Sequence, residues 1–342
     1  MDWMAEVRQR VDARLGSFLA EKRARAAGLS GESAEFVDAI TALTMRGGKR
    51  LRPAVLFAAF CAVRSDADDD DVAPTVDASA ALELLQSYLL IHDDWMDGDA
   101  ERRGGPAVHA ALAARYGDAH LGAALAVLAG DLASAYALEL LCAARFPDGR
   151  LPEALRAFHV MHEEVVLGQH LDLTAAGDVS IMQQLKTGSY TVRGPLTLGA
   201  LLGDGSAAQI SQLMRFGGPV GVAFQLRDDL LGTFGDPKLT GKPSGNDLRP
   251  GKRTALTAAA ERLLSTAARA PLDALRGRAD ASDAEVEGAK ALLVSSGARA
   301  EVERALGAHV AEARAALEGG EFSRRGQARL SALLSLLTER DR

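Results

Sequence analysis

Helical periodicity runs along nearly the whole chain, and the alternation of apolar and polar residues that marks a strand is scarce. Ala and Leu, two strong helix formers, dominate the apolar positions. The pattern therefore favours an all-α fold over any sheet architecture. The expected helices span roughly residues 3–24, 33–45, 53–64, 73–98, 106–115, 118–144, 151–175, 180–188, 190–203, 206–232, 252–267, 282–296, 299–318 and 322–338. The expected loops span roughly residues 65–71, 146–150 and 233–251.

No Pro-, Ser- or Gly-rich linker divides the 342 residues, and no repeat of fixed period is visible. We therefore expect a single domain spanning 1–342. Apolar residues make up 48% of the chain, which is enough for a large core. The net charge of −7 argues against broad nucleic-acid binding, although it allows a local basic site for a small anion.

Several features favour a cytoplasmic protein. The N-terminal segment mixes charged and apolar residues as an amphipathic helix does, unlike a signal peptide. The long apolar stretch Leu121–Ala144 is interrupted by Asp131 and Glu139, which is typical of a buried core helix rather than a membrane span. Cys61 and Cys142 lie far apart in apolar helical patterns, so we expect two buried thiols in a reducing compartment.

An acidic motif, Asp93–Asp97, closes the apolar run Leu82–Ile91. On a helix, Asp93 and Asp97 lie on one face one turn apart, with Asp94 beside them. Like charges at this spacing cost about 0.2–0.5 kcal/mol, and carboxylates near a helix C-terminus also oppose its dipole. A divalent cation would turn the repulsion into attraction, and Mg²⁺ prefers one or two carboxylates together with substrate phosphate oxygens. The alternative is an exposed acidic helix end.

A second acidic pair, Asp228-Asp229, closes another apolar helix, Val220–Leu226. Two such pairs about 130 residues apart suggest helices that face one another across a cavity, with metal ions bridging a diphosphate. The alternative is two unrelated helix ends.

Basic segments complement these acidic pairs. Gly47–Pro53 combines a flexible Gly-Gly turn, three cations and a proline suited to a first helical turn. Backbone N–H groups at a helix start, with Lys and Arg nearby, form an anion site. Arg102-Arg103-Gly104 follows the first acidic motif closely enough to share its ligand, and Lys186, Lys242 and Lys252 add cations after other helices. Taken singly, each of these residues is typical of a solvated surface charge.

These motifs, in this order, resemble those of the trans-polyprenyl diphosphate synthase family. The resemblance extends from Gly47 to about Arg253. The matching segments are Gly47–Pro53 (GGKRxRP), Asp93–Asp97 (DDxxD), Arg102–His109 (RRGxPxxH), Gly168–Asp172 (GQxxD), Lys186-Thr187, Phe224–Asp229, Gly241–Pro243 (GKP) and Asp247–Lys252 (DLxxGK). The resemblance implies an isoprenoid synthase helical bundle around a central cavity, commonly a homodimer.

The family resemblance also implies the reaction, which is head-to-tail condensation of isopentenyl diphosphate with an allylic diphosphate. It implies three Mg²⁺ ions held by Asp93, Asp97 and Asp228. The implied catalytic set is Asp93, Asp94, Asp97, Arg102, Lys186, Thr187, Gln225, Asp228, Asp229 and Lys242. The implied binding set for isopentenyl diphosphate is Lys49, Arg52, Gln86, Arg103 and Lys252.

Two residues depart from the family pattern. Gly232 replaces the last aspartate of the second acidic motif, which should weaken the third metal site, and Asp236 is a candidate to compensate. Gln86 stands where many relatives carry a histidine that contacts isopentenyl diphosphate, and its amide can still donate a hydrogen bond to phosphate.

Product length depends on the depth of the pocket below the metals. Leu89 lies one turn before Asp93, and Tyr88 stands where the family often has an aromatic floor. A single aromatic residue there resembles geranylgeranyl (C20) synthases, while C15 and longer products stay open. Two other functions also stay open, a class I terpene cyclase and a non-catalytic subunit of a heteromeric synthase. Gly47–Pro53, as a site for a second diphosphate, argues against the cyclase. The intact acidic pairs argue against the non-catalytic subunit.

Overall fold

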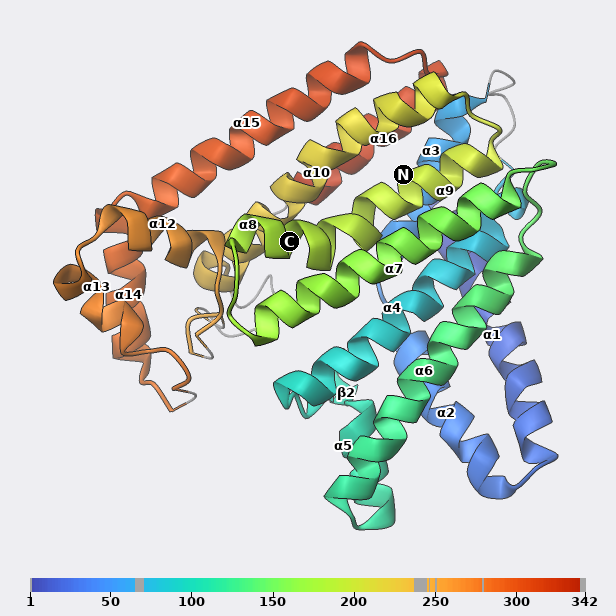
Figure 1. Ribbon diagram of the computed structural model, residues 1–342, viewed down its shortest axis with the longest axis horizontal. Helices are drawn as coiled ribbons and strands as arrows, with labels where there is room; N and C mark the ends of the chain where they lie inside the picture. Colours follow the sequence, from blue (N-terminus) through green and yellow to red (C-terminus); the bar gives the residue numbers. More distant parts are fainter. Residues whose placement is uncertain are drawn as a thin grey trace. The chain divides into compact units, whose positions relative to one another are not determined.

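The computed structural model describes residues 2–64, 71–236, 245, 247–249, 251–278 and 280–338 (Figure 1). Two compact units are present. The first contains Met1–Leu155 and Leu198–Gly205, and the second contains Arg156–Thr197 and Ser206–Arg342. The single domain spanning 1–342 stays a prediction. The described residues are overwhelmingly helical, as expected.

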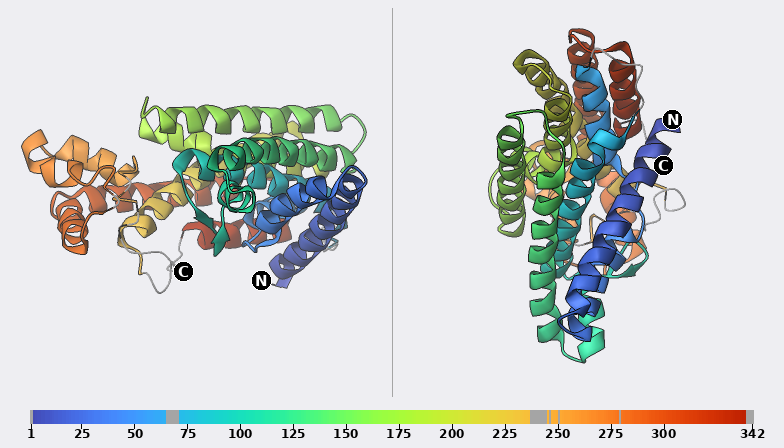
Figure 2. Two further views of the ribbon diagram at one scale, coloured as in Figure 1. Left: turned by 90° about the horizontal axis from the view of Figure 1, so that it is seen from below. Right: turned by 90° about the vertical axis from the view of Figure 1, so that its right-hand side faces the viewer.

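The first unit is a set of packed helices with one small hairpin. Its elements are α1 (Asp2–Ala27), α2 (Gly31–Met45), α3 (Leu51–Val63), the 3₁₀ turn η1 (Ala73–Thr75), α4 (Val76–Asp97), β1 (Glu101–Arg102), β2 (Gly105–Pro106), α5 (Val108–Tyr116) and α6 (Ala119–Ala143). Helix α4 packs most extensively on α6 and also contacts α1 and α3. Figure 2 shows α1, α4 and α6 as long rods that run alongside one another.

Helix α3 is buried on almost every side and forms the centre of this unit. The chain returns to it at residues 198–205, where a Cβ atom on Gly199 would lie 2.9 Å from the carbonyl carbon of Leu56. Glycine therefore allows the two backbones to approach closely. The ends of neighbouring helices are set by local signals, such as the Asp118 side chain that accepts from the N–H of Leu121 and Gly98 in the left-handed conformation after α4.

The second unit is also helical. Its elements are α7 (Leu151–Leu173), α8 (Val179–Gln183), the π-helix η2 (Gln184–Arg193), α9 (Gly194–Leu202), α10 (Ala207–Phe234), α12 (Ala255–Leu263), α13 (Thr266–Asp273), α14 (Asp283–Ser295), α15 (Ala298–Glu318) and α16 (Arg324–Thr338). The chain passes between the units within α7, within α9 and again between Gly205 and Ser206, so the start of α7 and the end of α9 belong to the first unit. Helix α10 packs along α15, η2 and α16. A capping box at Ser206 and Gln209 fixes the start of α10.

The structure differs from the expected elements in three places. One helix was expected at 252–267, but α12 and α13 are separate because Leu264 is extended and the Ser265 side chain caps α13. A helix break was expected near residue 189, but the chain winds through it as the π-helix η2. The β1–β2 hairpin was not expected, because strands of two residues are too short to show a period.

Helix α6 exposes part of its apolar surface. Among the described residues it is the one helix long and apolar enough to cross a membrane, a test that core helices also pass. A third of its most apolar 18-residue window is buried within the chain, so the expected core helix is buried on one face only. Both cysteines carry free thiols as expected, but Cys142 is exposed, because it lies on the uncovered face of α6.

Candidate active site

The first acidic motif lies at the C-terminal end of α4, and its three carboxylates have different surroundings. Asp94 is fully buried, and its Oδ1 accepts a hydrogen bond of 2.6 Å from Nε of Arg102. Burial raises the pKa of Asp94, and the bond from Arg102 opposes that shift. Asp93 is 24% exposed, with Nη2 of Arg102 3.8 Å from its carboxylate, and Asp97 is exposed. The motif thus presents Asp93 and Asp97 outward and turns Asp94 inward.

The hairpin that carries Arg102 and Arg103 is fastened to the Gly-Gly segment. Arg103 (φ 54°) and Gly104 (φ 73°) form its two-residue turn, and positive φ at both residues is the signature of a type I′ turn. Arg46 donates to the carbonyl oxygens of Arg102 and Pro106 at 3.0 and 2.9 Å. A Cβ atom on Gly105 would lie 2.6 Å from the Arg46 guanidinium carbon, so glycine makes room for this clamp.

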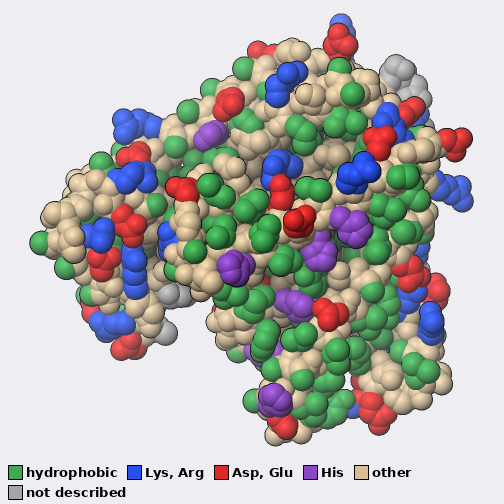
Figure 3. All heavy atoms as spheres, viewed as in Figure 1, with side chains coloured by type: hydrophobic (Ala, Val, Ile, Leu, Met, Phe, Trp, Pro, Cys, Tyr) green, Lys and Arg blue, Asp and Glu red, His purple; other side chains and the backbone are tan. Residues whose placement is uncertain are grey.

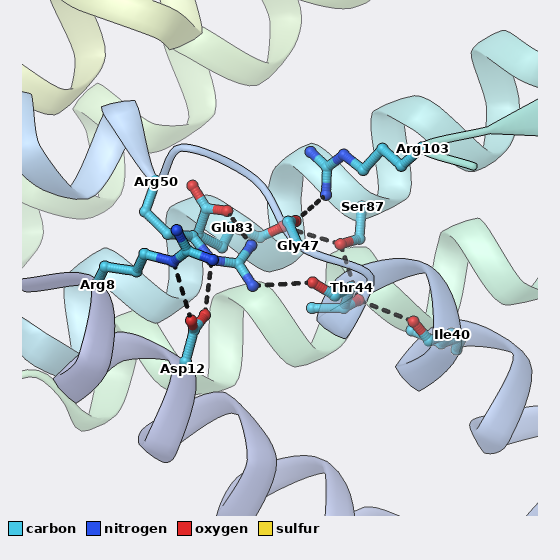
Figure 4. Close-up of polar contacts among 9 residues, drawn as sticks. All are labelled: Arg8, Asp12, Ile40, Thr44, Gly47, Arg50, Glu83, Ser87 and Arg103. Carbon is cyan, nitrogen blue, oxygen red and sulfur yellow. Dashed lines mark hydrogen bonds and ion pairs between the residues drawn. The ribbon is translucent and has the colours of Figure 1, made fainter. Parts of the chain in front are cut away.

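The Gly47–Arg50 turn rests on a buried ion pair (Figure 4). Arg50 has φ 47° and is 4% exposed. Its guanidinium donates to Oδ1 of Asp12 at 2.8 Å, to Oε2 of Glu83 at 2.5 Å and to the carbonyl oxygen of Thr44 at 3.0 Å. Burial opposes the charge on Arg50, but pairing with Glu83 and Asp12 raises its pKa. From the sequence, Arg50 was expected to be one of three cations of an anion site, but its guanidinium is engaged by Glu83 and Asp12, two residues for which no role was predicted.

Three further cations come from the turn, from the start of α3 and from the hairpin. Lys49 is exposed and Arg52 is buried on the first turn of α3. Arg103 donates to the carbonyl oxygen of Gly47 at 2.9 Å. Burial, together with the charges of Arg50, Arg52 and Arg102, lowers the pKa of Arg103, although Glu83 opposes the shift. Crowded, partly desolvated cations of this kind are stabilised by a bound anion.

In the second unit, the second acidic pair lies near the end of α10 and shows the same division of roles. Asp228 is exposed and Asp229 is 3% exposed. The Asp229 carboxylate accepts from Nε2 of Gln183 and Nε2 of Gln225, both at 2.8 Å, and from the N–H of Ala255 at 2.7 Å. Burial raises the pKa of Asp229 to about 6 despite these three donors. The bond to Asp229 engages the amide nitrogen of Gln225 and leaves its oxygen for another partner.

Lys186 and Thr187 both lie in the π-helix η2, a rare element that is frequent at functional sites. A Cβ atom on Gly168 would lie 2.7 Å from Cα of Lys186, so glycine allows α7 to approach η2 at this point. Asp172, one turn further along α7, pairs with Nζ of Lys186 at 2.7 Å. The GQxxD segment therefore serves to position Lys186, while Thr187 beside it is half-buried.

Most of the other residues implied by the family resemblance lie on α4 or in the second unit. Gln86 and Leu89 are half-buried on α4, and Tyr88 is buried with its ring edge-on to His92 at a centroid distance of 4.9 Å. Lys252 is 54% exposed in the second unit, with Nζ 3.8 Å from Oδ1 of Asp247. Lys242 lies outside the described residues.

Each acidic motif offers carboxylates of the kind that a hard divalent cation binds. Asp93, Asp97 and Asp228 are the carboxylates that reach the surface, whereas Asp94 and Asp229 are engaged by buried donors. Among residues 2–64, 71–236 and the described parts beyond, no three His, Cys, Asp or Glu side chains are grouped to hold a metal ion. Mg²⁺ sites of the kind that binds a phosphate ligand generally use one or two carboxylates with waters and phosphate oxygens.

Comparison with known proteins identifies the class. The crystal structure of geranylgeranyl pyrophosphate synthase from Corynebacterium glutamicum, complexed with isoprenyl diphosphate and magnesium, matches with a TM-score of 0.90 and 34% identity over 98% of this chain and 99% of that one. The fold is therefore the all-α isoprenoid synthase fold, as the sequence resemblance implied.

Two relatives and a family model narrow the assignment. The short chain isoprenyl diphosphate synthase of Methanocaldococcus jannaschii is 33% identical over 74% of this chain and 75% of its own. The geranylfarnesyl diphosphate synthase of Aeropyrum pernix is 35% identical over 79% of this chain and 80% of its own. The polyprenyl synthetase family model matches residues 33–293. The chain belongs to this family, and it is a prenyltransferase that makes polyprenyl diphosphates.

The raised pKa of Asp229 predicts a specific pH dependence of stability. Its folded pKa of about 6 exceeds the ordinary 3.8, so the stability that its proton contributes is complete below pH 3.8 and is lost as pH rises through 6. The loss amounts to roughly 2–3 kcal/mol in the free energy of unfolding. Replacing Asp229 with Asn removes this titration.

Denaturant unfolding of the native protein and of Asp229→Asn from pH 4 to pH 7 measures the effect. The stability of the native protein relative to the variant should fall across the interval. The exposed loop variant Asp148→Asn provides the baseline for general pH effects. A difference between native protein and Asp229→Asn that stays constant with pH would contradict the assignment.

Proposed function

We propose that this chain is a Mg²⁺-dependent geranylgeranyl diphosphate synthase that condenses isopentenyl diphosphate head to tail with allylic diphosphates. The observation that carries the proposal lies in the first unit. Burial and neighbouring cations lower the pKa of Arg103 there. Arg103 belongs to the same hairpin as Arg102, whose guanidinium donates to Asp94 at the acidic end of α4. A site with crowded cations beside outward carboxylates suits a diphosphate and its metal ions.

The diphosphate of the allylic substrate is assigned to the acidic motifs. Asp93, Asp97 and Asp228 would hold Mg²⁺, which we expect as three ions. Bound there, Mg²⁺ supplies Lewis-acid neutralisation of the departing pyrophosphate. Arg102, Lys186 and Lys242 add positive charge, and the pairing of Arg102 with Asp94 and of Lys186 with Asp172 limits the rearrangement needed when charge develops.

The diphosphate of isopentenyl diphosphate is assigned to the basic turn and its neighbours. The binding residues are Lys49, Arg52, Gln86, Arg103 and Lys252. Because Arg50 is held by Glu83 and Asp12, it shapes the turn instead of binding substrate.

The reaction needs no protein nucleophile. The allylic C–O bond breaks and its electron pair leaves with pyrophosphate, giving an allylic cation. The double bond of isopentenyl diphosphate attacks that cation, and a proton then passes to an oxygen of the released pyrophosphate. The oxygens of Thr187 and Gln225 are assigned to stabilise the cation electrostatically. Asp229 is assigned to hold Gln225 in place.

We further propose a cytoplasmic homodimer. Helix α6 of the first unit exposes Leu121 (39%) and Leu128 (56%), and Figure 3 shows hydrophobic side chains gathered on parts of the face that it draws. Exposed apolar surface of this extent marks a contact site, and a second copy of the chain would bury it symmetrically.

Sedimentation equilibrium tests the dimer. The native protein should show twice the chain mass of 35.9 kDa, and Leu128→Asp should shift the equilibrium toward the monomer because it places a charge in the interface. Val294→Asp, on the exposed face of α14, is the matched control and should leave the mass unchanged. A native mass of one chain would remove the homodimer from the proposal.

The metal assignment predicts the effect of Asp93→Ala. The variant should lose several orders of magnitude in turnover, because it removes a carboxylate that neutralisation of the leaving group requires. The assay contains isopentenyl diphosphate, Mg²⁺ and, separately, C5, C10 and C15 allylic diphosphates, with an EDTA control. The exposed loop variant Asp148→Ala should retain native turnover. Near-native turnover of Asp93→Ala would contradict the metal assignment. Absence of elongation by the native protein would contradict the proposed function.

The product length is tested by Tyr88→Ala. Tyr88 is the large, buried aromatic residue of α4 in the turns before Asp93, so its removal should deepen the pocket. We expect native protein to give mainly C20 and the variant to give products longer by at least one isoprene unit, resolved by chromatography. Tyr116→Ala, an exposed change on α5, should leave the length unaltered. An unchanged product length in Tyr88→Ala would show that another residue closes the end of the pocket. A main product of C15 or C25 from the native protein would contradict the proposed C20 product.

A further inference from the structure

One side chain of α4 fills a space that a glycine leaves on the surface of α6. His92 is the residue before the first acidic motif, and its imidazole faces α6 within the first unit. A Cβ atom built on Gly130 would lie 3.0 Å from Cε1 of His92, with two other ring atoms nearer still. Real Cβ atoms do not tolerate such contacts, so glycine at position 130 is what leaves room for the ring.

Polar contacts hold the imidazole in that space. Its Nε2 atom lies 3.0 Å from the carbonyl oxygen of Val127, and the Nε2–H tautomer donates a hydrogen bond there. The same atom lies 3.9 Å from Oδ1 of Asp131. Gly130 and Asp131 follow Val127 by three and four residues, so all three stand on one face of α6. The His92 side chain is 19% exposed, so the contact is mostly enclosed.

The imidazole also contacts the ring of Tyr88. Tyr88 precedes His92 by four residues, so the two side chains share a face of α4. Their ring centroids are 4.9 Å apart and their planes meet at 73°, the edge-to-face arrangement that aromatic pairs favour. Burial, and after it the charge of Asp131, raises the pKa of Tyr88, so the phenol also senses α6.

His92 therefore stands between Tyr88 and α6. Because α6 encloses the imidazole, the ring of Tyr88 cannot turn toward α6 without displacing His92 from a closely packed site. A residue that limits product length has to keep its position while a longer prenyl chain presses on it. A ring free to move to another rotamer would leave room for a further isoprene unit.

We propose that His92, held against α6 by Gly130 and Val127, is a positioning residue that fixes the ring of Tyr88 and thereby limits the length of the product. The inference rests on the proposed function and on Tyr88 as the residue that closes the pocket. It adds a support from α6 to that residue. The role depends on packing and requires no change of charge on the imidazole.

Two readouts test the role. The first is the chain length of the products made from isopentenyl diphosphate and a C15 allylic diphosphate. The second is the ratio of the dissociation constants for C25 and C20 prenyl diphosphates, measured by calorimetry with Mg²⁺. Both ligands carry the same diphosphate, so a disturbance near Asp93 weakens both alike and cancels in the ratio. The ratio also needs no turnover, so it applies to a variant that is inactive.

His92→Ala should shift the main product from C20 to C25 or longer. It should also lower the affinity ratio by about 10-fold, comparable to the effect of one poorly fitting apolar group. His92→Gln should retain mainly C20, because its amide can still donate to Val127 and fills most of the space beside Tyr88. On a Tyr88→Ala background, His92→Ala should lengthen the product no further, because the ring that it supports is already gone.

The glycine on α6 gives an independent arm. Gly130→Ala should lower the melting temperature and extend the products beyond C20, because its methyl group displaces the imidazole. On a His92→Ala background it should add neither effect. Gly122→Ala is the matched control on the same helix, since its Cβ would lie 2.6 Å from Cα of Ala113 on α5. This control should lower the melting temperature and leave the product at C20.

Three outcomes would overturn the inference. A native affinity ratio in both His92→Ala and Gly130→Ala, with longer products from Tyr88→Ala, would show that Tyr88 needs no support. Longer products from Gly122→Ala would assign the effect to a general loosening of α6. Additive lengthening by His92→Ala and Tyr88→Ala would show that the two residues act separately. Failure of the proposed function is distinct, because the native protein would then elongate no substrate.

Discussion

The buried ion pair of Arg50 and Glu83 is the interaction on which the first unit depends. Both side chains are 2% exposed, and removing two charges from water costs several kcal/mol for each ion. The cost is offset because the guanidinium also finds Asp12 on α1 and the Thr44 carbonyl on α2. Helices α1, α2 and α4 therefore meet at one cation that precedes α3. Losing one partner of such a pair would leave a buried charge uncompensated, at a cost of about 3–5 kcal/mol.

That pair also arranges the cations assigned to substrate. With Arg50 locked in a left-handed conformation, the turn presents Lys49 to solvent and starts α3, which carries Arg52. The carbonyl oxygen of Gly47 then receives Arg103 and so fixes the hairpin. The crowding lowers the pKa of Arg103 through burial and neighbouring charge, which disfavours the protein without an anion. The diphosphate that we propose to bind here would find these cations already in place and would reduce their mutual repulsion.

The sequence predicted most helices and the positions of both acidic motifs near helix ends, because these features follow from local spacing. The sequence did not show that Arg50 is buried while Lys49 beside it is exposed, because the backbone conformation of the turn decides which side chain points inward. The role of Glu83 could not be predicted either, because a single acidic residue among the apolar residues of α4 does not indicate which partner it binds. The π-winding of η2 depends on contacts with other helices, including the approach that Gly168 permits, and composition carries no trace of it.

Both acidic pairs follow one physical rule. Successive residues of a helix point about 100° apart, so a pair at the edge of the core turns one carboxylate outward and the next inward. Asp94 and Asp229 are the inward members, and each is held by donors that lie outside its own helix, Arg102 for the first and Gln183 with the Ala255 N–H for the second. These bonds fix the rotation of each helix end, and with it the direction of Asp93 and Asp228. The partners differ in charge, however. Asp94 accepts from a guanidinium, whereas Gln183, Gln225 and the Ala255 N–H offer Asp229 only neutral amide donors to offset its burial. Protonation of Asp229 as the pH falls toward 6 would therefore weaken the bonds that orient the second acidic pair.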